Sequence, residues 1–491
     1  MTGSRTQLAA LALAVAGLVS ACGGSTNNGP GGIGESGASL VSSGAVLYAS
    51  VDSDLSSGRW QQVDELLKKF PIRDKLLDEL KQALAKHQLD YDDDIKPALG
   101  PELDVASVPG TSAQDTPYAV FTKPDSIDKA KALVSKLNEG SSPEVTRVVD
   151  GWLFIGDTQT MIDRVLKGSG SALADDSRFK EAFGQLPEDS LAKLYANGPA
   201  LSKLVSSFSA VAQAAALQGS DSNKLDWVAV AAFAEDDGIK IEGDAKSTTG
   251  GSLVGPAYSS KLISGVPADS FAFLTYHGRG GSDPLKSLRQ NPSFGEALRQ
   301  IEQELGMPLD TVLALFQHET AFYVRRGPGL PEFSLVLEAP DTEQALTTIN
   351  RLAARVATLS SARLGTERED GLDVKTLDFG PVTVRWAGFD GRVLLTTSPT
   401  GISDYRSSGD KLADSSAYRD ALDGAGAPEE TNGLVYLNVG DLAHLIENYA
   451  GLAGGNLPAE LEPNLKPLRS FVAYGGSDGD LTTFAAKLEI K

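Results

Sequence analysis

Hydrophobic and polar positions along the chain form the same series of patterns twice. Gly44–Val51 and Ser270–Tyr276 are short alternating apolar runs, which are typical of strands. Each run is followed by apolar residues at intervals of three and four, between Leu76 and Leu84 in the first half and between Phe294 and Leu305 in the second. This spacing predicts an amphipathic helix after each strand.

Three further units recur in the same order. Each half contains a strand that ends in Pro-Asp before a helix, then an Asp-Gly turn suited to a two-residue hairpin, then an amphipathic helix capped by a serine. The units occupy Tyr118–Asp125, Asp150–Ile155 and Ser177–Phe183 in the first half, and Phe333–Asp341, Asp390–Leu395 and Ser416–Leu422 in the second. Because chance similarity would not preserve the order, the series indicates a duplication with loop insertions.

The repeated series predicts an α+β fold made of two tandem copies of one module. Each copy mixes hairpins with helices, so we expect a mixed, largely antiparallel sheet with helices packed on it. The copies span residues 40–250 and 260–491, and a Gly- and Ser-rich stretch, 246–260, marks the join. The pattern leaves open whether the copies share one continuous sheet through an edge strand of each.

The strand before a helical pair, the strand–Pro–Asp–helix unit and the Asp-Gly hairpin before a serine-capped helix together resemble a bacterial protein family. That family consists of secreted or lipid-anchored proteins and is known only as a domain of unknown function. The resemblance extends from about Leu40 to Lys491. It implies the duplicated α+β module, and it brings no activity, cofactor or catalytic residue.

The first residues carry the pattern of an export signal. Leu8–Val19 is an uninterrupted apolar stretch behind a single basic residue, Arg5, and is shorter than the roughly 20 residues that a membrane-spanning helix needs. It leads into Val19–Cys22 (VSAC), which resembles the lipobox of bacterial lipoproteins. A plain secretory signal with an incidental cysteine is the alternative.

The lipobox pattern predicts where the mature protein resides. We expect residues 1–21 to be removed as a lipoprotein signal peptide, Cys22 to carry a lipid, and residues 22–39 to form a flexible tether rich in Gly and Ser. Such an anchor places the protein on the extracytoplasmic face of a bacterial membrane, with the lipid as its membrane contact.

The chain is strongly acidic, which narrows the classes of partner. Of its 491 residues, 65 are Asp or Glu and 44 are Lys or Arg, giving a formal charge of −21. A chain of this charge is repelled by phosphate backbones, so we expect no nucleic-acid partner. Its single cysteine excludes an internal disulfide and a thiolate metal site within one chain.

The histidines form no recognisable metal motif. His318 and Glu319 begin like the zinc-binding pattern HExxH, but position 322 is Phe, so the second imidazole is missing. The other histidines are scattered through different predicted elements, and we expect packing or surface roles for them: His87, His277 and His444. His277 is the best placed of these for a ligand contact, because a Gly-rich turn follows it.

Two other patterns are also incomplete. Asp90, Asp92 and Asp94 have the spacing of the first ligands of an EF-hand calcium loop. Ile95 and Pro101 replace the glycine and glutamate that the loop requires, so an acidic helix start is the better interpretation. Three Ser-x-x-Lys pairs lack the companion tripeptides of penicillin-recognising enzymes. The sequence therefore predicts no catalytic residue, no cofactor and no metal site.

Two long segments rich in small and apolar residues stand at equivalent places in the halves, Pro199–Gly219 and Asp441–Leu457. Their spacing predicts helices with one apolar face, which is typical of helices that cover a sheet. The alternative is an apolar groove for an acyl chain or a partner. The residues of that groove would be Leu204, Phe208, Val211, Leu445 and Tyr449.

These observations favour a non-catalytic, lipid-anchored envelope protein that binds or scaffolds other envelope components. A carrier for a hydrophobic or lipid ligand is the first alternative, based on the two apolar segments. An envelope hydrolase without a recognisable motif is the second, because side chains from distant loops can assemble a site that spacing does not reveal.

Overall fold

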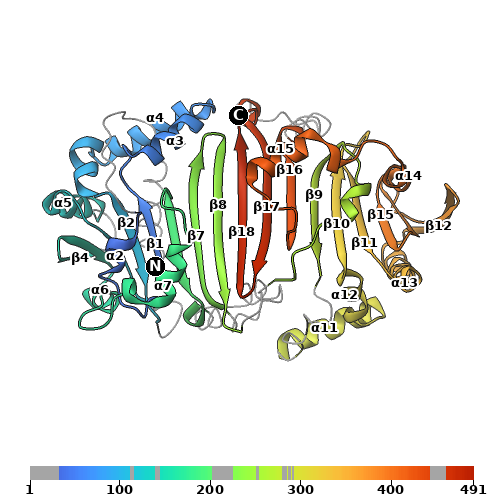
Figure 1. Cartoon of the computed structure of the whole chain (residues 1–491), viewed down its shortest axis with the longest axis horizontal. Coiled ribbons are helices and arrows are strands. Elements are labelled where there is room, and N and C mark those ends of the chain that lie inside the picture. The colour runs from blue at the N-terminus through green and yellow to red at the C-terminus, as the bar shows by residue number, and fades with distance from the viewer. Residues whose placement is uncertain are drawn as a thin grey trace.

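In the part of the chain that the structure describes, 18 strands pair into a single antiparallel sheet (Figure 1). The structure is a computed structural model that describes residues 32–110, 116–138, 144–201, 225–249, 254–278, 285, 289, 292–442 and 461–491. Helices pack on this sheet, so the fold is α+β with a large antiparallel sheet, which confirms the predicted fold class.

The strands are short and pair mostly with their sequence neighbours. In the first half they are β1 (Leu47–Asp52), β2 (Glu102–Ser107), β3 (Tyr118–Thr122), β4 (Val145–Val149), β5 (Trp152–Gly156), β6 (Ala192–Asn197), β7 (Leu225–Glu235) and β8 (Gly238–Ser247). In the second half they are β9 (Ser270–His277), β10 (Glu319–Arg325), β11 (Glu332–Glu338), β12 (Arg363–Glu369), β13 (Leu372–Asp378), β14 (Thr383–Phe389), β15 (Arg392–Thr396), β16 (Gly433–Asn438), β17 (Leu468–Asp478) and β18 (Leu481–Ile490).

Read outward from its centre, the sheet has the same strand order on both sides. On one side the order is β8, β7, β6, β1, β2, β3, β5 and β4. On the other side it is β18, β17, β16, β9, β10, β11, β15 and β14, followed by the hairpin of β13 and β12. The halves thus share one connectivity, and the second half carries one extra hairpin.

The two halves belong to one continuous sheet. β8 and β18 pair antiparallel, from Gly238 opposite Glu489 to Lys246 opposite Leu481. In Figure 1 these strands lie side by side near the middle of the molecule, each next to its own hairpin partner, β7 or β17. The pairing answers the question that the sequence pattern leaves open, because each half contributes its closing hairpin to the join.

Asp-Gly turns close three of the hairpins. Asp150 and Gly151 have φ of 50° and 82° between β4 and β5, and Asp390 and Gly391 have φ of 49° and 71° between β14 and β15. Positive φ at both turn residues is the type I′ geometry that the sequence predicts at these two places. The pair at 370 and 371 closes the extra hairpin of β12 and β13 with φ of 49° and 80°, and this turn is not among those predicted from the sequence.

Helices cover both faces of the sheet. In the first half the α-helices are α2 (Glu35–Ala38), α3 (Gly58–Leu67), α4 (Ile72–Lys86), α5 (Ile127–Leu137), α6 (Gln159–Val165) and α7 (Ser177–Gly184). In the second half they are α11 (Pro292–Leu305), α12 (Leu309–Leu313), α13 (Thr342–Ser360), α14 (Gly401–Arg406), α15 (Ser416–Ala425) and α17 (Leu461–Leu465). Across the described ranges, no helix combines the length and the apolar content that a membrane crossing requires.

Two helices begin one residue away from the predicted position. The N-cap of α7 is Asp176, whose Oδ1 accepts hydrogen bonds from the N–H groups of Arg178 at 2.9 Å and Phe179 at 3.2 Å. The N-cap of α15 is Ser415. The prediction that Ser177 and Ser416 cap these helices is therefore wrong. At α7 the reason is that a carboxylate satisfies two free N–H groups and also lies at the positive end of the helix dipole.

Each half has its own aromatic core under an equivalent helix. Phe179 of α7 packs edge-on against Tyr48 and Tyr195, with ring centroids 5.6 and 5.3 Å apart. Tyr418 of α15 makes the equivalent contact with Tyr436 at 5.0 Å. The opposite face of each half is buried against α5 or α13. A sheet covered on both faces leaves the turns and strand ends as the places where polar groups gather.

Candidate functional site

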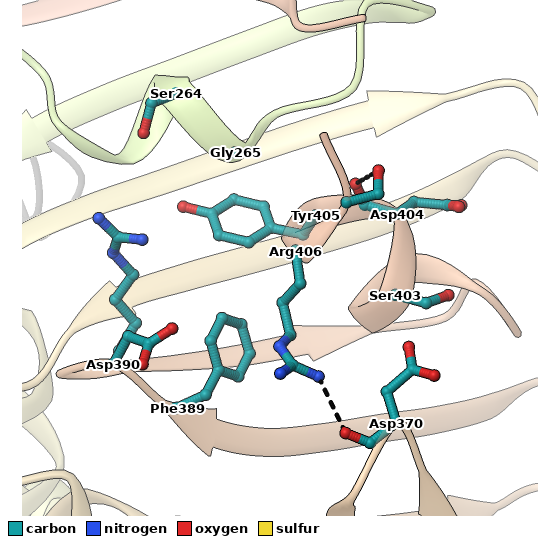
Figure 2. A pocket seen from close by; sticks show the side chains of 11 residues that line it. Ser264, Gly265, Asp370, Phe389, Asp390, Ser403, Asp404, Tyr405 and Arg406 are labelled. Atoms are coloured by element: carbon teal, nitrogen blue, oxygen red, sulfur yellow. Dashed lines mark hydrogen bonds between the residues drawn. The ribbon is translucent and has the colours of Figure 1, made fainter. Parts of the chain in front are cut away.

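A polar pocket of about 680 Å³ lies in the second half, near the extra hairpin (Figure 2). It is bounded by the short 3₁₀ helix η7 (Leu262–Gly265), the turns of two hairpins, and α14. Asp370 comes from the β12–β13 turn; Phe389, Asp390 and Arg392 come from the β14–β15 turn; and Ser403 to Ser407 come from α14 and the residue after it.

A second, smaller hollow of about 220 Å³ lies where the two halves join. Residues of β8, β17 and β18 line it, together with Gln185 and Leu186 after α7. Small-molecule sites have volumes of about 300–1,000 Å³, so the larger pocket falls in that range and the hollow at the join falls below it. The larger pocket is therefore the candidate site.

A half-buried ion pair holds α14 at the edge of the pocket. Arg325 of β10 donates from Nη2 to Asp404 Oδ2 at 2.5 Å and from Nε to Glu332 Oε2 at 2.8 Å. Thr400 Oγ1 also donates to Asp404 Oδ2, at 2.7 Å. Burial raises the pKa of Asp404, but the hydrogen bonds from Thr400 and Arg325 outweigh it, so the pKa lies below its ordinary value. Asp404 therefore anchors the helix as a carboxylate.

Two arginines bring donors to the pocket. The guanidinium carbon of Arg406 lies 5.4 Å from the centre of the Phe389 ring, a cation–π distance, and its Nη1 donates to the main-chain oxygen of Asp370 at 3.4 Å (Figure 2). Arg392 follows the Asp390-Gly391 turn and lines the same pocket. Among the described residues, neither Arg392 nor Arg406 has a carboxylate partner within ion-pair distance.

Two carboxylates balance these two charges. Asp370 and Asp390 occupy the two Asp-Gly turns and line the pocket on the two sides of Phe389 in Figure 2. With Asp404 paired to Arg325, the remaining charged groups of the pocket are two guanidinium groups and two carboxylates. The pocket thus offers hydrogen-bond donors and acceptors, and unpaired charges of both signs, on the same wall.

The hydroxyl groups of the pocket donate their hydrogen bonds to main-chain carbonyls. Ser264 Oγ donates to the carbonyl of Lys261 at 2.7 Å, and Ser403 Oγ donates to the carbonyl of Thr400 at 2.9 Å. Ser407 Oγ donates to the carbonyl of Asp404 at 2.9 Å. The buried Tyr405 hydroxyl donates to the carbonyl of Leu262 at 2.8 Å. These contacts fix the wall, and none of them pairs a hydroxyl with a base as an activated nucleophile requires.

The strongest electrostatic perturbation among the described residues of the first half lies outside both pockets described above. Asp104 is fully buried beside Glu102, and burial, followed by repulsion from Glu102, raises its pKa. Burial also raises the pKa of Glu102, with a smaller contribution from repulsion by Asp52. Glu102 Oε2 accepts from the N–H of Gly34 at 2.6 Å. A Cβ on Gly37 would lie 1.7 Å from Asp104 Oδ2, so α2 covers the pair directly. This cluster is enclosed, so it holds α2 on the sheet.

Glu319 plays the equivalent part in the second half. It lies opposite His277 at the start of β10, as Glu102 lies opposite Asp52 at the start of β2. Its Oε1 accepts from Ser260 Oγ at 2.5 Å and from the N–H of Leu262 at 3.1 Å. Each half therefore uses a buried glutamate to fix the segment that precedes its first long strand. This structural role explains the glutamate that follows His318 in the sequence.

Comparison with known families identifies the chain. The profile of the family described as "Protein of unknown function (DUF3352)" matches residues 6–147 and 134–489. The chain belongs to this family. Two segments match and overlap, as expected of a duplicated chain, and the resemblance stated from the sequence motifs is confirmed. This DUF3352 protein has no match among curated proteins.

Two solved structures are similar to part of this DUF3352 chain. They are crystal forms III and IV of TP0453, with sequence identities of 10% and 11% and a TM-score of 0.24 for each. Each alignment covers 47% of this chain, and 95% and 92% of the respective TP0453 chain.

The candidate residues from the sequence fall into two groups. Cys22 and the five groove residues, Leu204, Phe208, Val211, Leu445 and Tyr449, lie outside the described residues, as do residues 1–31 and His444. His87 ends α4 on the surface. His277 and His318, assigned to different elements, come together at the ends of two paired strands with ring centroids 6.4 Å apart.

The pocket residues are not among the candidates that the sequence predicts. Arg392, Arg406 and Asp370 belong to no motif, and their side chains meet only because two hairpin turns and a helix converge. The available signal was the Asp390-Gly391 turn, which the repeat comparison detected as a structural feature. Charged residues on and just after such a turn are the ones that a search guided by the repeat would have selected.

Proposed function

We propose that this DUF3352 protein is a lipid-anchored envelope protein that binds, without converting it, a neutral polyhydroxylated ligand such as a segment of an envelope glycan. The ligand occupies the pocket between η7, α14 and the two Asp-Gly turns. The observation that carries the proposal is that unpaired groups of both signs line this pocket, the guanidinium groups of Arg392 and Arg406 and the carboxylates of Asp370 and Asp390.

The charge balance favours a neutral ligand over an ionic one. A phosphate or carboxylate ligand would be attracted by Arg392 and Arg406 but repelled by Asp370 and Asp390, within a chain whose formal charge is −21. A cationic ligand would be attracted by the two aspartates and repelled by the two arginines. A saccharide hydroxyl both accepts and donates a hydrogen bond, so it can accept from guanidinium and donate to carboxylate at the same time.

The state of the hydroxyl groups favours binding over catalysis. The three serines and the tyrosine of the pocket donate to main-chain carbonyls, which fixes their orientation and leaves no hydroxyl paired with a general base. The VSAC sequence before the predicted anchor supports a location where envelope glycans are within reach. The hydrogen-bonded hydroxyl groups and the VSAC sequence both support the non-catalytic binding protein expected from the sequence.

The experiment is a binding titration of the purified full chain in detergent against neutral oligosaccharides. Maltotetraose, chitotetraose and mannotetraose serve as probes, with inorganic phosphate and citrate as ionic competitors. We expect one of the saccharides to bind, and we expect Arg392→Gln and Asp390→Asn each to weaken binding at least about tenfold, since each removes one charged hydrogen bond. Arg299→Gln, on the exposed face of α11, is the control.

Three results would contradict the proposal. Tight binding of phosphate or citrate in place of the saccharides would make the pocket an anion site. Unchanged saccharide affinity in Arg392→Gln and Asp390→Asn would place the site elsewhere. Cleavage of the bound saccharide, detected by mass spectrometry after incubation, would replace the binding function by hydrolysis.

A further inference from the structure

Two histidines and a glutamate that are distant in the sequence meet at the ends of three neighbouring strands. His277 is the last residue of β9, His318 immediately precedes β10, and Glu338 is the last residue of β11. One ligand atom from each of these side chains lies within 4.8 Å of the others. This set is independent of the pocket described above.

The sheet itself brings the three residues together. His277 lies opposite Glu319 in the pairing of β9 with β10, so His318 is the next residue along that edge. Thr320 lies opposite Leu337 in the pairing of β10 with β11, which brings Glu338 to the same edge. The N–H of Gly278 donates to the carbonyl of His318 at 3.2 Å. The three main chains are thus held in register, and the side chains start from fixed positions.

Main-chain contacts also orient two of the three side chains. His277 Nδ1 lies 2.8 Å from the carbonyl oxygen of Gly278. A carbonyl can only accept, so Nδ1 carries the proton and Nε2 keeps the lone pair that binds a metal. Glu338 Oε2 accepts from the N–H of Glu319 at 3.2 Å. A histidine that donates its other nitrogen to a carbonyl is the usual outer support of a metal ligand.

The composition of the set selects the cation. Imidazole nitrogens bind zinc and related transition metals, whereas calcium and magnesium prefer oxygen ligands alone. Two imidazoles with one carboxylate is the donor set of open zinc sites, in which water takes the fourth position. Ligand atoms around tetrahedral zinc are about 3.4 Å apart, given bonds of about 2.1 Å. Because His318 is exposed, its ring can rotate to close the remaining separation.

The first half does not carry this set. The shared register places Asp52 at the position of His277, Pro101 at that of His318, and Lys123 at that of Glu338. Asp52 is instead paired with Arg59 at 2.9 Å. The three ligands therefore belong to the second half alone, in contrast to the buried glutamates that both halves share.

We infer that His277, His318 and Glu338 form a zinc site with three protein ligands and one open position. The site accepts one Zn²⁺ per chain, and the open position is available to water or to a donor group of a partner molecule. The cation adds positive charge at one edge of a strongly acidic protein.

The test is calorimetric titration of the chelator-treated full chain with zinc chloride. We expect one site per chain, lost or weakened at least tenfold in His318→Ala and in Glu338→Gln. Cys22→Ser serves as the background for every variant, because an unacylated thiol would also bind zinc. His87→Ala, a surface histidine at the end of α4, is the matched control and keeps full affinity. Cobalt added in place of zinc reports tetrahedral coordination by its visible absorption.

The folding of each variant is checked separately by its thermal denaturation. Zinc should raise the melting temperature of the parent chain and of His87→Ala, and should leave that of His318→Ala unchanged. Equal zinc affinity in the parent chain and in His318→Ala would overturn the inference. So would the absence of one-to-one binding by a parent chain that is folded. Binding of copper or nickel with exclusion of zinc would also overturn the assignment of the cation.

Discussion

The hydroxyl oxygen of Tyr48 lies 2.9 Å from Asp104 Oδ2 and 2.7 Å from the carbonyl oxygen of Gly34. The hydroxyl has one hydrogen for these two acceptors. If Tyr48 donates to Gly34, the second contact needs a hydrogen on Asp104, which can then donate to the tyrosine oxygen. Burial, followed by repulsion from Glu102, raises the pKa of Asp104 well above its ordinary value, in agreement with a protonated carboxyl.

Asp104 should make the protein less stable as the pH rises. A carboxyl whose pKa is raised on folding holds its proton in the folded state after the unfolded chain has lost it. Its contribution is full below the unfolded pKa near 3.8 and is lost as the pH rises toward the folded value, by roughly 1 kcal/mol per pH unit. Denaturant unfolding at pH 4, 6 and 8 should show this decline.

The variant Asp104→Asn should be more stable than the parent at pH 8 and less dependent on pH. Asn keeps the shape and can donate to Tyr48 without a titrating proton. Tyr48→Phe, in contrast, should cost about 1–3 kcal/mol at every pH, because it removes both contacts of the hydroxyl and leaves the buried carboxyl of Asp104 without its tyrosine partner. A steeper pH dependence in Asp104→Asn than in the parent would refute the protonated carboxyl.

Gly37→Ala should destabilise the first half strongly. The new Cβ would lie 1.7 Å from Asp104 Oδ2 and 2.8 Å from the Tyr48 hydroxyl, so α2 would have to move off the cluster that it covers. We expect the free energy of unfolding, measured by urea denaturation, to fall by about 3 kcal/mol, at the upper end of the range for overpacked core sites. Gly58→Ala at the start of α3 is the matched control, because its Cβ meets nothing within 4 Å. A similar loss in both variants would contradict the steric argument.

Arg325→Gln should cost about 3–5 kcal/mol and weaken ligand binding in the pocket. The substitution leaves the buried carboxylate of Glu332 without a cation, and it frees Asp404 and with it α14. Its neighbour Arg326 forms an exposed pair with Asp441 at 2.6 Å, so Arg326→Gln should cost about 1 kcal/mol or less. Thermal and denaturant unfolding of both variants would check the difference, and equal costs would show that burial is not what matters.

Glu144 should titrate near neutrality. Burial, followed by repulsion from Asp157, raises its pKa to about 7. Asp157→Asn removes part of the cause, so it should lower the pKa of Glu144 by a measurable fraction of a unit while burial keeps it above the ordinary value. Carboxyl carbon NMR of selectively labelled glutamate, with Glu144→Gln to assign the signal, measures this pKa. A value at or below 4.5 in the parent would contradict the prediction.

The modular fold was predictable because its signals are local. Asp150-Gly151 and Asp390-Gly391 predict hairpins because both residues of each pair favour positive φ. The recurrence of these turns and their neighbouring units in the same order indicates the duplication. The joining of β8 to β18 was not predictable, because alternation tells which face a residue takes and says nothing of which distant strand lies beside it. The hairpin 363–378 was missed because its first strand is polar and almost entirely exposed.

The sites were harder to predict than the fold. Arg392 and Arg406 belong to common surface residue types, and only the meeting of a turn with α14 gives them a shared ligand. The ligand atoms of His277, His318 and Glu338 lie within 4.8 Å of one another, but the three residues come from three different strands or their ends. The HExxH motif requires its ligands at fixed spacing on one helix. Because position 322 is Phe, the motif is incomplete and does not mark His318 as a ligand. The residues that lie near His318 come from neighbouring strands, which no fixed spacing reveals.

The join of β8 with β18 has a consequence for biogenesis. β8 is synthesised more than two hundred residues before its neighbour in the sheet, so the first half emerges with an open row of hydrogen-bonding groups. Until β18 is synthesised, the unpaired N–H and C=O groups of β8 can pair with any other extended polypeptide, including a second copy of this chain at the same stage of synthesis. Protection by a chaperone would therefore matter most in the interval between the folding of the first half and the arrival of β18.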